Sequence, residues 1–251
     1  TGGGIDDLSL VRYRETLDPT SPEIVLLIPK DAEKAYYAEF GWVAGDGQPG
    51  PGPETPWRAS RGTLSLENPV TLTWDNGQGL KFSRTYAVDE NFMFTVSQKV
   101  VNTGAKPATL YPYGLLSRRG TPEVTGFYIL HEGLMGVFGG TLEEIDYDEI
   151  QDQVQVKKTA QGGWIGITDK FWLAALVPDD SPLIALVGQV CVHGNSVAEY
   201  GLTLAGPRIG ARQVDVHVAP LNDECDHILI SLQERSMAGR MDHQLSHRRA
   251  A

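Results

Sequence analysis

The chain has 251 residues, of which 41% are hydrophobic, and its 21 basic and 32 acidic side chains give a formal net charge of −11. A chain of this length can bury a sizeable core without disulfides or a metal, and its acidic balance disfavours nucleic acid, because phosphate binding needs clustered Lys and Arg. No apolar run approaches the ~18 residues of a membrane helix, and we find no signal-peptide pattern. We therefore expect a soluble chain without a membrane-spanning segment, or the soluble part of a membrane protein.

Short apolar runs separated by turn residues fill most of the chain up to Asp180 and predict β-strands. The runs are Ile5–Arg14, Ile24–Ile28, Tyr36–Trp42, Val70–Trp74, Leu80–Tyr86, Phe92–Val101, Thr109–Leu116 and Phe127–Leu130. Asn76-Gly77 turns the clearest hairpin, since both residues tolerate positive φ. We expect a loop over Gly45–Pro56 and a helical turn within Glu143–Ile150. Strands at about ten-residue spacing without a long helical pattern predict an all-β sandwich.

The run Gly162–Asp180 predicts two buried strands joined by a tight polar turn, and the composition of the chain changes where it ends. Residues 1–180 hold 20 of the 21 aromatic residues and a net charge of −10. Residues 181–251 hold Tyr200 as their one aromatic, both cysteines and five of the six histidines. We therefore expect two domains, 1–180 and 181–251. Cys191 and Cys225 do not have a metal-ligand spacing.

The part of the chain after Asp180 predicts a different architecture. Ser181-Pro182 has the pattern of an N-cap followed by Pro at the first helical position, and Leu183–Val190 carries apolar residues on one helical face. Strands are expected over Val197–Leu204, Gln213–Leu221 and Asp226–Glu234. A polar, helix-prone segment, Ser236–Ala251, follows. Together these elements predict an incomplete α/β unit.

Several segments of residues 1–180 resemble one known family. They are Ile5–Leu10, Tyr13–Thr16, Tyr37–Trp42, Val70–Gly79, Thr109–Leu115, Tyr128–Gly133 and Gly162–Asp180. In order and in sequence they are similar to the periplasmic domain of the bacterial membrane protein insertase YidC. The resemblance implies a mainly β fold, a β-supersandwich related in shape to galactose mutarotases, on the periplasmic side of the bacterial inner membrane.

The sequence after Asp180 resembles a different family. Ser181–Leu186, Val197–Gly201, Ala205–Gly210 and Ser231–Ala238 are similar to the second half of the PAS domain, and to the start of the dimerisation helix, of the nitrogen-regulation sensor kinase NtrB. The resemblance implies a C-terminal α/β PAS-like fragment that dimerises through residues 236–251. It does not carry a phospho-acceptor role to any histidine of this chain.

Two groups of side chains are candidates for chemistry. His131 and Glu132 could form the acid–base pair of a mutarotase-like site, but neighbours in a strand point to opposite faces, which favours a structural histidine. Asp146–Glu149, with Glu143 and Glu144, could bind a cation through oxygen ligands. The cluster lacks the Gly-centred spacing of a calcium loop, so a solvated acidic face is favoured.

The basic pair and the tryptophans each allow a structural and a functional interpretation. Arg118-Arg119 is a short basic pair, interpreted as a solvated patch and not as a phosphate site. The tryptophans could line a groove for extended peptide, or fill the core, which is favoured because each buries a large apolar area. They are Trp42, Trp57, Trp74, Trp164 and Trp172. Open sandwich edges could also accept a peptide strand.

From these patterns we expect a chain that is not an enzyme, with no catalytic, cofactor-binding or metal-ligating residues and no cofactor. The resemblance implies a docking or chaperone-like domain that assists the insertion and folding of inner-membrane proteins. Its expected partners are Sec translocon components and nascent membrane proteins. Two alternatives stay open: a carbohydrate-binding or mutarotase-like module, and a fragment of a two-component nitrogen sensor kinase.

Overall fold

The structure is a computed structural model of the chain. It describes residues 2–45, 50–91, 93–105, 108–122, 131–153, 155–169, 172–178, 182–193, 197–205, 213–221 and 227–235.

Most of the described chain is β-strand. The first strands are β1 (Leu8–Arg14), β2 (Glu23–Leu27), β3 (Tyr36–Ala44), β4 (Arg58–Ala59), β5 (Val70–Asp75), β6 (Leu80–Val88), β7 (Phe94–Asn102) and β8 (Leu110–Arg119). They are followed by β9 (Gly133–Phe138), β10 (Thr141–Asp146), the helix α1 (Tyr147–Gln153), β11 (Gln155–Gln161), β12 (Gly163–Asp169) and β13 (Trp172–Val177). The last strands are β14 (Pro182–His193), β15 (Val197–Ala205), β16 (Gln213–Leu221) and β17 (His227–Arg235).

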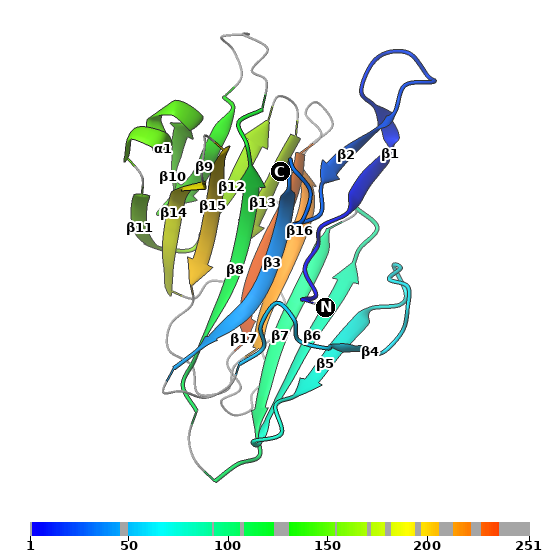
Figure 1. The fold of residues 1–251 in the computed structure, drawn as a ribbon, viewed down its shortest axis with the longest axis vertical. Helices are drawn as coiled ribbons and strands as arrows, with labels where there is room; N and C mark the ends of the chain where they lie inside the picture. The colour runs from blue at the N-terminus through cyan, green and yellow to red at the C-terminus, as the bar shows by residue number, and fades with distance from the viewer. Residues whose placement is uncertain are drawn as a thin grey trace, which may run out of the picture.

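Two sheets form the layers of the fold, as Figure 1 shows. One sheet has ten strands in the order β10-β9-β12-β13-β17-β16-β7-β6-β5-β4, and the other has five in the order β11-β14-β15-β8-β3. β1 and β2 pair separately as a two-stranded ribbon. The mainly β sandwich expected from the sequence is thus confirmed.

The core lies between the two layers. It takes buried side chains from both sheets, among them Phe40 and Leu116 from the five-stranded sheet and Val96, Ile167 and Leu176 from the ten-stranded one. A second, smaller cluster gathers at the other end of the sandwich around Trp42, Leu80, Phe82, Val100 and Leu110. Along most strands both clusters use every second residue, as a sheet with one buried face requires.

The hairpin of β5 and β6 has the turn that its sequence predicts. Gly77 has φ +70°, a conformation that glycine adopts without steric cost. Asn76 Oδ1 accepts from the main-chain N–H groups of Gln78 and Leu80, at 2.8 and 3.0 Å. The turn sets the register, because Trp74 opposes Phe82 and Thr73 opposes Ser83.

The prediction of a helix over Leu183–Val190 is wrong. These residues lie in β14, which pairs with β11 on one side and with β15 on the other. Pairing on both sides outweighs a local helical pattern, and a run rich in Leu, Ile and Val fits a strand as well as a helix face. Pro182 occupies the first position of the strand, where a missing N–H is tolerated.

Other expectations have mixed outcomes. The two strands of the Gly162–Asp180 run are confirmed as β12 and β13, which pair in antiparallel register. The strands expected between Val197 and Glu234 are confirmed as β15, β16 and β17, and β17 runs parallel to β13. The helical turn falls at Tyr147–Gln153, after a strand that was not expected. The segments 127–130 and 236–251 lie outside the described residues.

The division into domains 1–180 and 181–251 stays a prediction, as does the PAS-like character of the second part. The pairings nonetheless place strands from beyond residue 180 inside both sheets, since β15 pairs with β8 and β17 with β13.

Candidate functional site

A trough with both polar and apolar lining residues lies on the outer face of the ten-stranded sheet. Its volume is about 660 Å³, and its lining comes from β4, β5, β6 and β7. Its charged and hydroxyl-bearing residues are Arg58, Thr73, Asp75, Lys81, Ser83 and Lys99, and Pro56, Trp74, Phe82 and Val101 complete the lining. These strands lie together at one end of the sandwich in Figure 1.

The register of the strands arranges these side chains in rows. Arg58 opposes Thr73, Thr73 opposes Ser83, and Ser83 opposes Lys99, so one row runs across four strands with a cation at each end. In the next row, Asp75 opposes Lys81. Register partners share a face of the sheet, so all of these residues lie on the face opposite to the core.

A third row consists of hydroxyl groups. Thr71 opposes Thr85, and Thr85 opposes Ser97. The Thr71 and Thr85 hydroxyls are hydrogen-bonded to each other at 2.9 Å. This part of the surface is therefore polar and rich in donors.

The trough carries more positive than negative charge, on a chain whose net charge is −11. Its lining has three cations, Arg58, Lys81 and Lys99, and one carboxylate, Asp75. Lys81 and Asp75 approach to 3.8 Å with both side chains more than half exposed. An exposed pair of this kind contributes little binding energy, so Lys81 stays available to a ligand.

Aromatic side chains pack on the core side of the strands that form the trough. Phe82 lies between Trp74 and Trp42, with ring centroids 5.4 and 5.2 Å away. Trp57 packs against the same cluster, 6.5 Å from Trp42. Trp42, Trp57 and Trp74 therefore contribute to packing, as the favoured interpretation of the tryptophans as core residues predicts.

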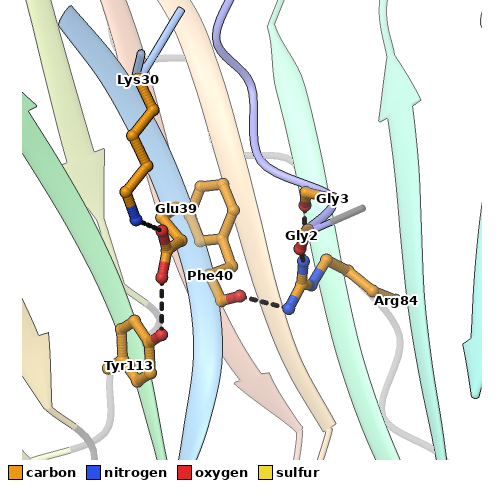
Figure 2. A network of polar contacts seen from close by, with 7 residues as sticks. All are labelled: Gly2, Gly3, Lys30, Glu39, Phe40, Arg84 and Tyr113. Atoms are coloured by element: carbon orange, nitrogen blue, oxygen red, sulfur yellow. Dashed lines mark hydrogen bonds and ion pairs between the residues drawn. The ribbon is translucent and has the colours of Figure 1, made fainter. Parts of the chain in front are cut away.

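Arg84 lies next to that cluster and is 1% exposed. Its Nη1 atom donates to the carbonyl oxygen of Gly3 at 2.5 Å, and Nη2 donates to the carbonyl oxygen of Phe40. The guanidinium also lies over the rings of Trp57 and Trp42, at 5.0 and 5.7 Å. Figure 2 shows how it bridges the N-terminal segment and β3.

This arrangement is structural. β3 is the last strand of its sheet, and Arg84 from the other sheet donates to one of its carbonyl groups at that edge. Gln98 Nε2 makes a similar contact with the carbonyl oxygen of Gly41, at 3.3 Å. Side-chain donors thus occupy an edge that would otherwise be open to another strand.

A second polar group lies beside Arg84 in Figure 2 and centres on Glu39. Lys30 Nζ donates to Glu39 Oε2 at 2.9 Å, and the Tyr113 hydroxyl donates to Oε1 at 2.8 Å. Burial and the neighbouring carboxylate raise the pKa of Tyr113 above its ordinary value. The Tyr113 hydroxyl therefore stays protonated and acts as a fixed donor.

The basic pair Arg118-Arg119 is not the solvated patch that was expected. Arg118 forms an ion pair with Asp169 at 2.6 Å, and its side chain is 20% exposed. Tyr147 donates to the same carboxylate at 2.6 Å. Arg119 donates to the carbonyl oxygen of Ala32 at 3.2 Å. The pair therefore ties neighbouring elements together.

His131, one member of the candidate acid–base pair, is held by neighbouring residues. His131 Nδ1 lies 3.1 Å from Asp146, and Nε2 lies 3.0 Å from the carbonyl oxygen of Leu134, so both ring nitrogens have protein partners. Glu132 Oε2 is buried, without a hydrogen-bond partner among the described residues.

The acidic segment does not converge on a cation site. Tyr147 and Ile150 are buried, whereas Asp148 and Glu149 lie in the first turn of α1, where carboxylates complement the helix dipole. Glu143 pairs with Lys158 at 2.6 Å. Among the described residues, no three His, Cys, Asp or Glu side chains gather closely enough to hold a metal.

Sequence reasoning missed the trough, although part of its signal was present. The alternation in β5 and β6 identified the core face of the hairpin, and the same alternation places Thr73, Lys81 and Ser83 on the opposite face. The row that joins them to Arg58 and Lys99 depends on β4 and on the register of β7, which the spacing of residues does not determine.

The comparisons with known proteins agree with this fold. The family model described as the YidC periplasmic domain matches residues 1–202. The match continues past Asp180 and includes β14 and most of β15. The chain belongs to this family, as a YidC-type periplasmic domain.

Relatives named membrane protein insertase YidC are similar to most of the chain. The protein of Methylorubrum extorquens is 46% identical over 220 residues, which cover 81% of this chain and 36% of the relative. That of Bradyrhizobium diazoefficiens is 50% identical over 183 residues, covering 72% and 30%. That of Methylobacterium radiotolerans is 49% identical over 240 residues, covering 86% and 39%. The chain thus spans about a third of the length of these relatives. The described residues include no helix with the length and hydropathy needed to cross a membrane.

Proposed function

We propose that the chain is the periplasmic docking domain of a membrane protein insertase. It acts without catalysis, as a surface that holds segments of inner-membrane proteins while they are inserted and folded. The relatives are named insertases, and the trough across β4–β7 is the observation that gives this chain a binding surface. Sec translocon components are proposed as further partners on the strength of the family alone.

The trough suits an unfolded segment better than a folded protein. It extends across four strands, and its outer side chains offer charges and hydroxyl groups to a ligand. An extended peptide exposes its own polar groups and can follow such a surface, whereas a folded partner needs a larger complementary area. Loops awaiting insertion are extended segments of this kind.

Fluorescence anisotropy of labelled loop peptides, titrated with the purified chain, tests this proposal. We expect saturable binding that is weakened in a Lys81→Glu, Lys99→Glu double variant. Lys157→Glu is a matched control on β11, because Lys157 is also exposed and lies on a strand of the other sheet. Absence of peptide binding would overturn the proposal, and saturable binding of free sugars instead would support the carbohydrate alternative.

Dimerisation through residues 236–251 also stays a proposal. Sedimentation of the full chain against a truncation ending at Arg235 tests it, and equal molecular masses for monomeric species in both samples would contradict it.

A further inference from the structure

The trough has a charge pattern that the docking function alone does not require. We propose that it selects extended segments that carry carboxylates at alternate positions, so that it prefers acidic loops over neutral or basic ones. This inference rests on the proposed docking function and specifies its substrate class.

The charge of the trough favours acidic ligands. Three cations against one carboxylate make the trough locally positive on a chain of net charge −11. At physiological ionic strength the Debye length is ~8 Å, so a ligand in the trough interacts mainly with the three cations and the one carboxylate, Asp75, of its lining, while more distant acidic groups are screened. The local charge therefore determines which peptides bind.

The spacing of two of the cations suits an extended peptide. Arg58 and Lys99 end a row that spans three inter-strand steps, and at ~4.8 Å per step the two strand positions lie ~14 Å apart. An extended peptide rises ~3.4 Å per residue, so four residues cover ~14 Å, and residues i and i+4 point to the same side. A peptide that lies along this row can therefore direct carboxylates at i and i+4 towards the two cations.

Lys81 lies beside this row and not on it. It opposes Val101, two pairs along the ladder from the Ser83–Lys99 pair, so Lys81 and Lys99 are diagonal neighbours. Diagonal neighbours lie ~7–8 Å apart, within reach of a long side chain, so Lys81 can approach the middle carboxylate of the peptide, at i+2, from one side. Between the cations lie the hydroxyl groups of Thr73 and Ser83, which make long bonds to the carbonyl oxygens of Arg58 and Lys99, at 3.4 and 3.5 Å. A hydroxyl group can rotate from such a weak bond and donate to a carboxylate oxygen instead.

Translocated loops are compatible with a positive surface. Loops that stay in the cytoplasm carry an excess of Lys and Arg, and loops that cross the membrane are depleted of them. A positive trough on a periplasmic domain therefore meets few basic side chains on translocated loops. It would repel the basic segments that belong on the other side.

The test compares four labelled 11-residue peptides with the full chain by anisotropy. The first carries Glu at positions i, i+2 and i+4, the second has Gln there, and the third has Lys. The fourth has the composition of the first with its three Glu residues adjacent. We expect the spaced acidic peptide to bind about tenfold more tightly than the Gln peptide, a difference of ~1.4 kcal/mol, because three exposed contacts of roughly 0.5 kcal/mol each give that total. Its affinity should fall between 0.15 and 1 M salt.

Matched variants locate the effect. Lys81→Gln with Lys99→Gln should reduce the preference for the acidic peptide about threefold or more, whereas Lys157→Gln should leave it unchanged. Thermal unfolding of each variant checks that the fold is intact.

Equal binding of the Glu and Gln peptides would overturn the acidic selection and leave the docking function standing, whereas failure of all four peptides would overturn both. Equal binding of the spaced and clustered acidic peptides would overturn the geometric argument. Binding to phosphatidylglycerol vesicles in place of peptide would assign the trough to a membrane surface and overturn the inference.

Discussion

Arg84 on β6 donates to the carbonyl oxygen of Gly3, 2.5 Å away, and so fixes the N-terminal segment against a strand 81 residues later in the chain. The same guanidinium donates to the carbonyl oxygen of Phe40. One buried side chain thus joins three parts of the sandwich that the sequence keeps far apart. Within the described residues its partners are neutral carbonyl, hydroxyl and ring groups.

Replacing Arg84 should destabilise the domain strongly. Arg84→Met keeps most of the volume but leaves the carbonyl group of Phe40 without its donor, and it removes one donor from the carbonyl oxygen of Gly3, which also accepts from the Tyr86 hydroxyl. Hydrogen bonds from a charged group contribute about 1.5–3 kcal/mol each, so we expect a loss of about 3 kcal/mol or more in the free energy of unfolding. Urea denaturation measures this loss. Lys81→Met, at an exposed position on the same strand, should change stability by less than about 0.5 kcal/mol. Similar losses in the two variants would contradict the role given to Arg84.

The glycine that accepts this bond should be hard to replace. Gly3 has φ +64°, and a Cβ atom there would lie 2.7 Å from Leu72 Cδ1. Gly3→Ala should therefore reduce stability by about 1 kcal/mol or more, through backbone strain and steric conflict. Gly62→Ala is the control, because a Cβ atom at Gly62 meets nothing within 4 Å. Equal unfolding midpoints for the two variants would mean that the N-terminal segment does not pack as described.

Asp169 predicts a pH dependence of stability. Burial raises its pKa above the ordinary value, although the ion pair with Arg118 and the hydrogen bond from Tyr147 oppose the shift. The folded state then holds this proton more tightly than the unfolded state. The stabilisation associated with the protonated carboxyl is therefore complete below the unfolded-state pKa of ~3.9 and is lost as pH rises through the raised folded-state pKa.

Asp169→Asn removes this titration. The unfolding free energy of the wild type minus that of the variant should decrease as pH rises from ~4 through the raised folded-state pKa of Asp169. Urea denaturation at a series of pH values measures it. A difference that grows in favour of the wild type with rising pH would show that Arg118 outweighs burial.

Limited proteolysis around Pro178 distinguishes two views of the chain. A separate domain starting at residue 181 predicts cleavage there and a stable 1–180 fragment. The pairing of β14 and β15 with β11 and β8 predicts instead that such a fragment lacks two strands of the five-stranded sheet, and exposes new edges. On the strength of the pairings, we expect a truncation after Asp180 to be less soluble than the full chain.

The local patterns predicted most strands of this fold, and the reasons differ between segments. Alternation and an Asn-Gly turn identified β5 and β6, because the alternating residues of a half-buried hairpin and the residues of its turn are both visible in the sequence. Leu183–Val190 misled because apolar residues that fit one helical face also fit a strand paired on both sides. The short strands β9, β10 and β11 were not predicted, since their Gly, Glu and Lys content hides the alternation.

The candidate site was less accessible to sequence reasoning than the fold. His131 and the acidic segment attracted attention by residue type, but each has local structural partners. The trough consists of ordinary Thr, Ser, Lys and Arg residues, and its character arises from the register that aligns Arg58, Ser83 and Lys99. Register depends on tertiary pairing, which no single segment encodes.

The central claim is that the outer face of β4–β7 binds extended acidic segments, and mapping backbone amide chemical shifts during titration with the spaced acidic peptide tests it most directly. We predict that the largest shifts fall on Arg58, Thr73, Lys81, Ser83 and Lys99, and that the amides of β11 stay unchanged. Shifts centred on the other sheet, or uniformly absent shifts at saturating peptide, would contradict the account.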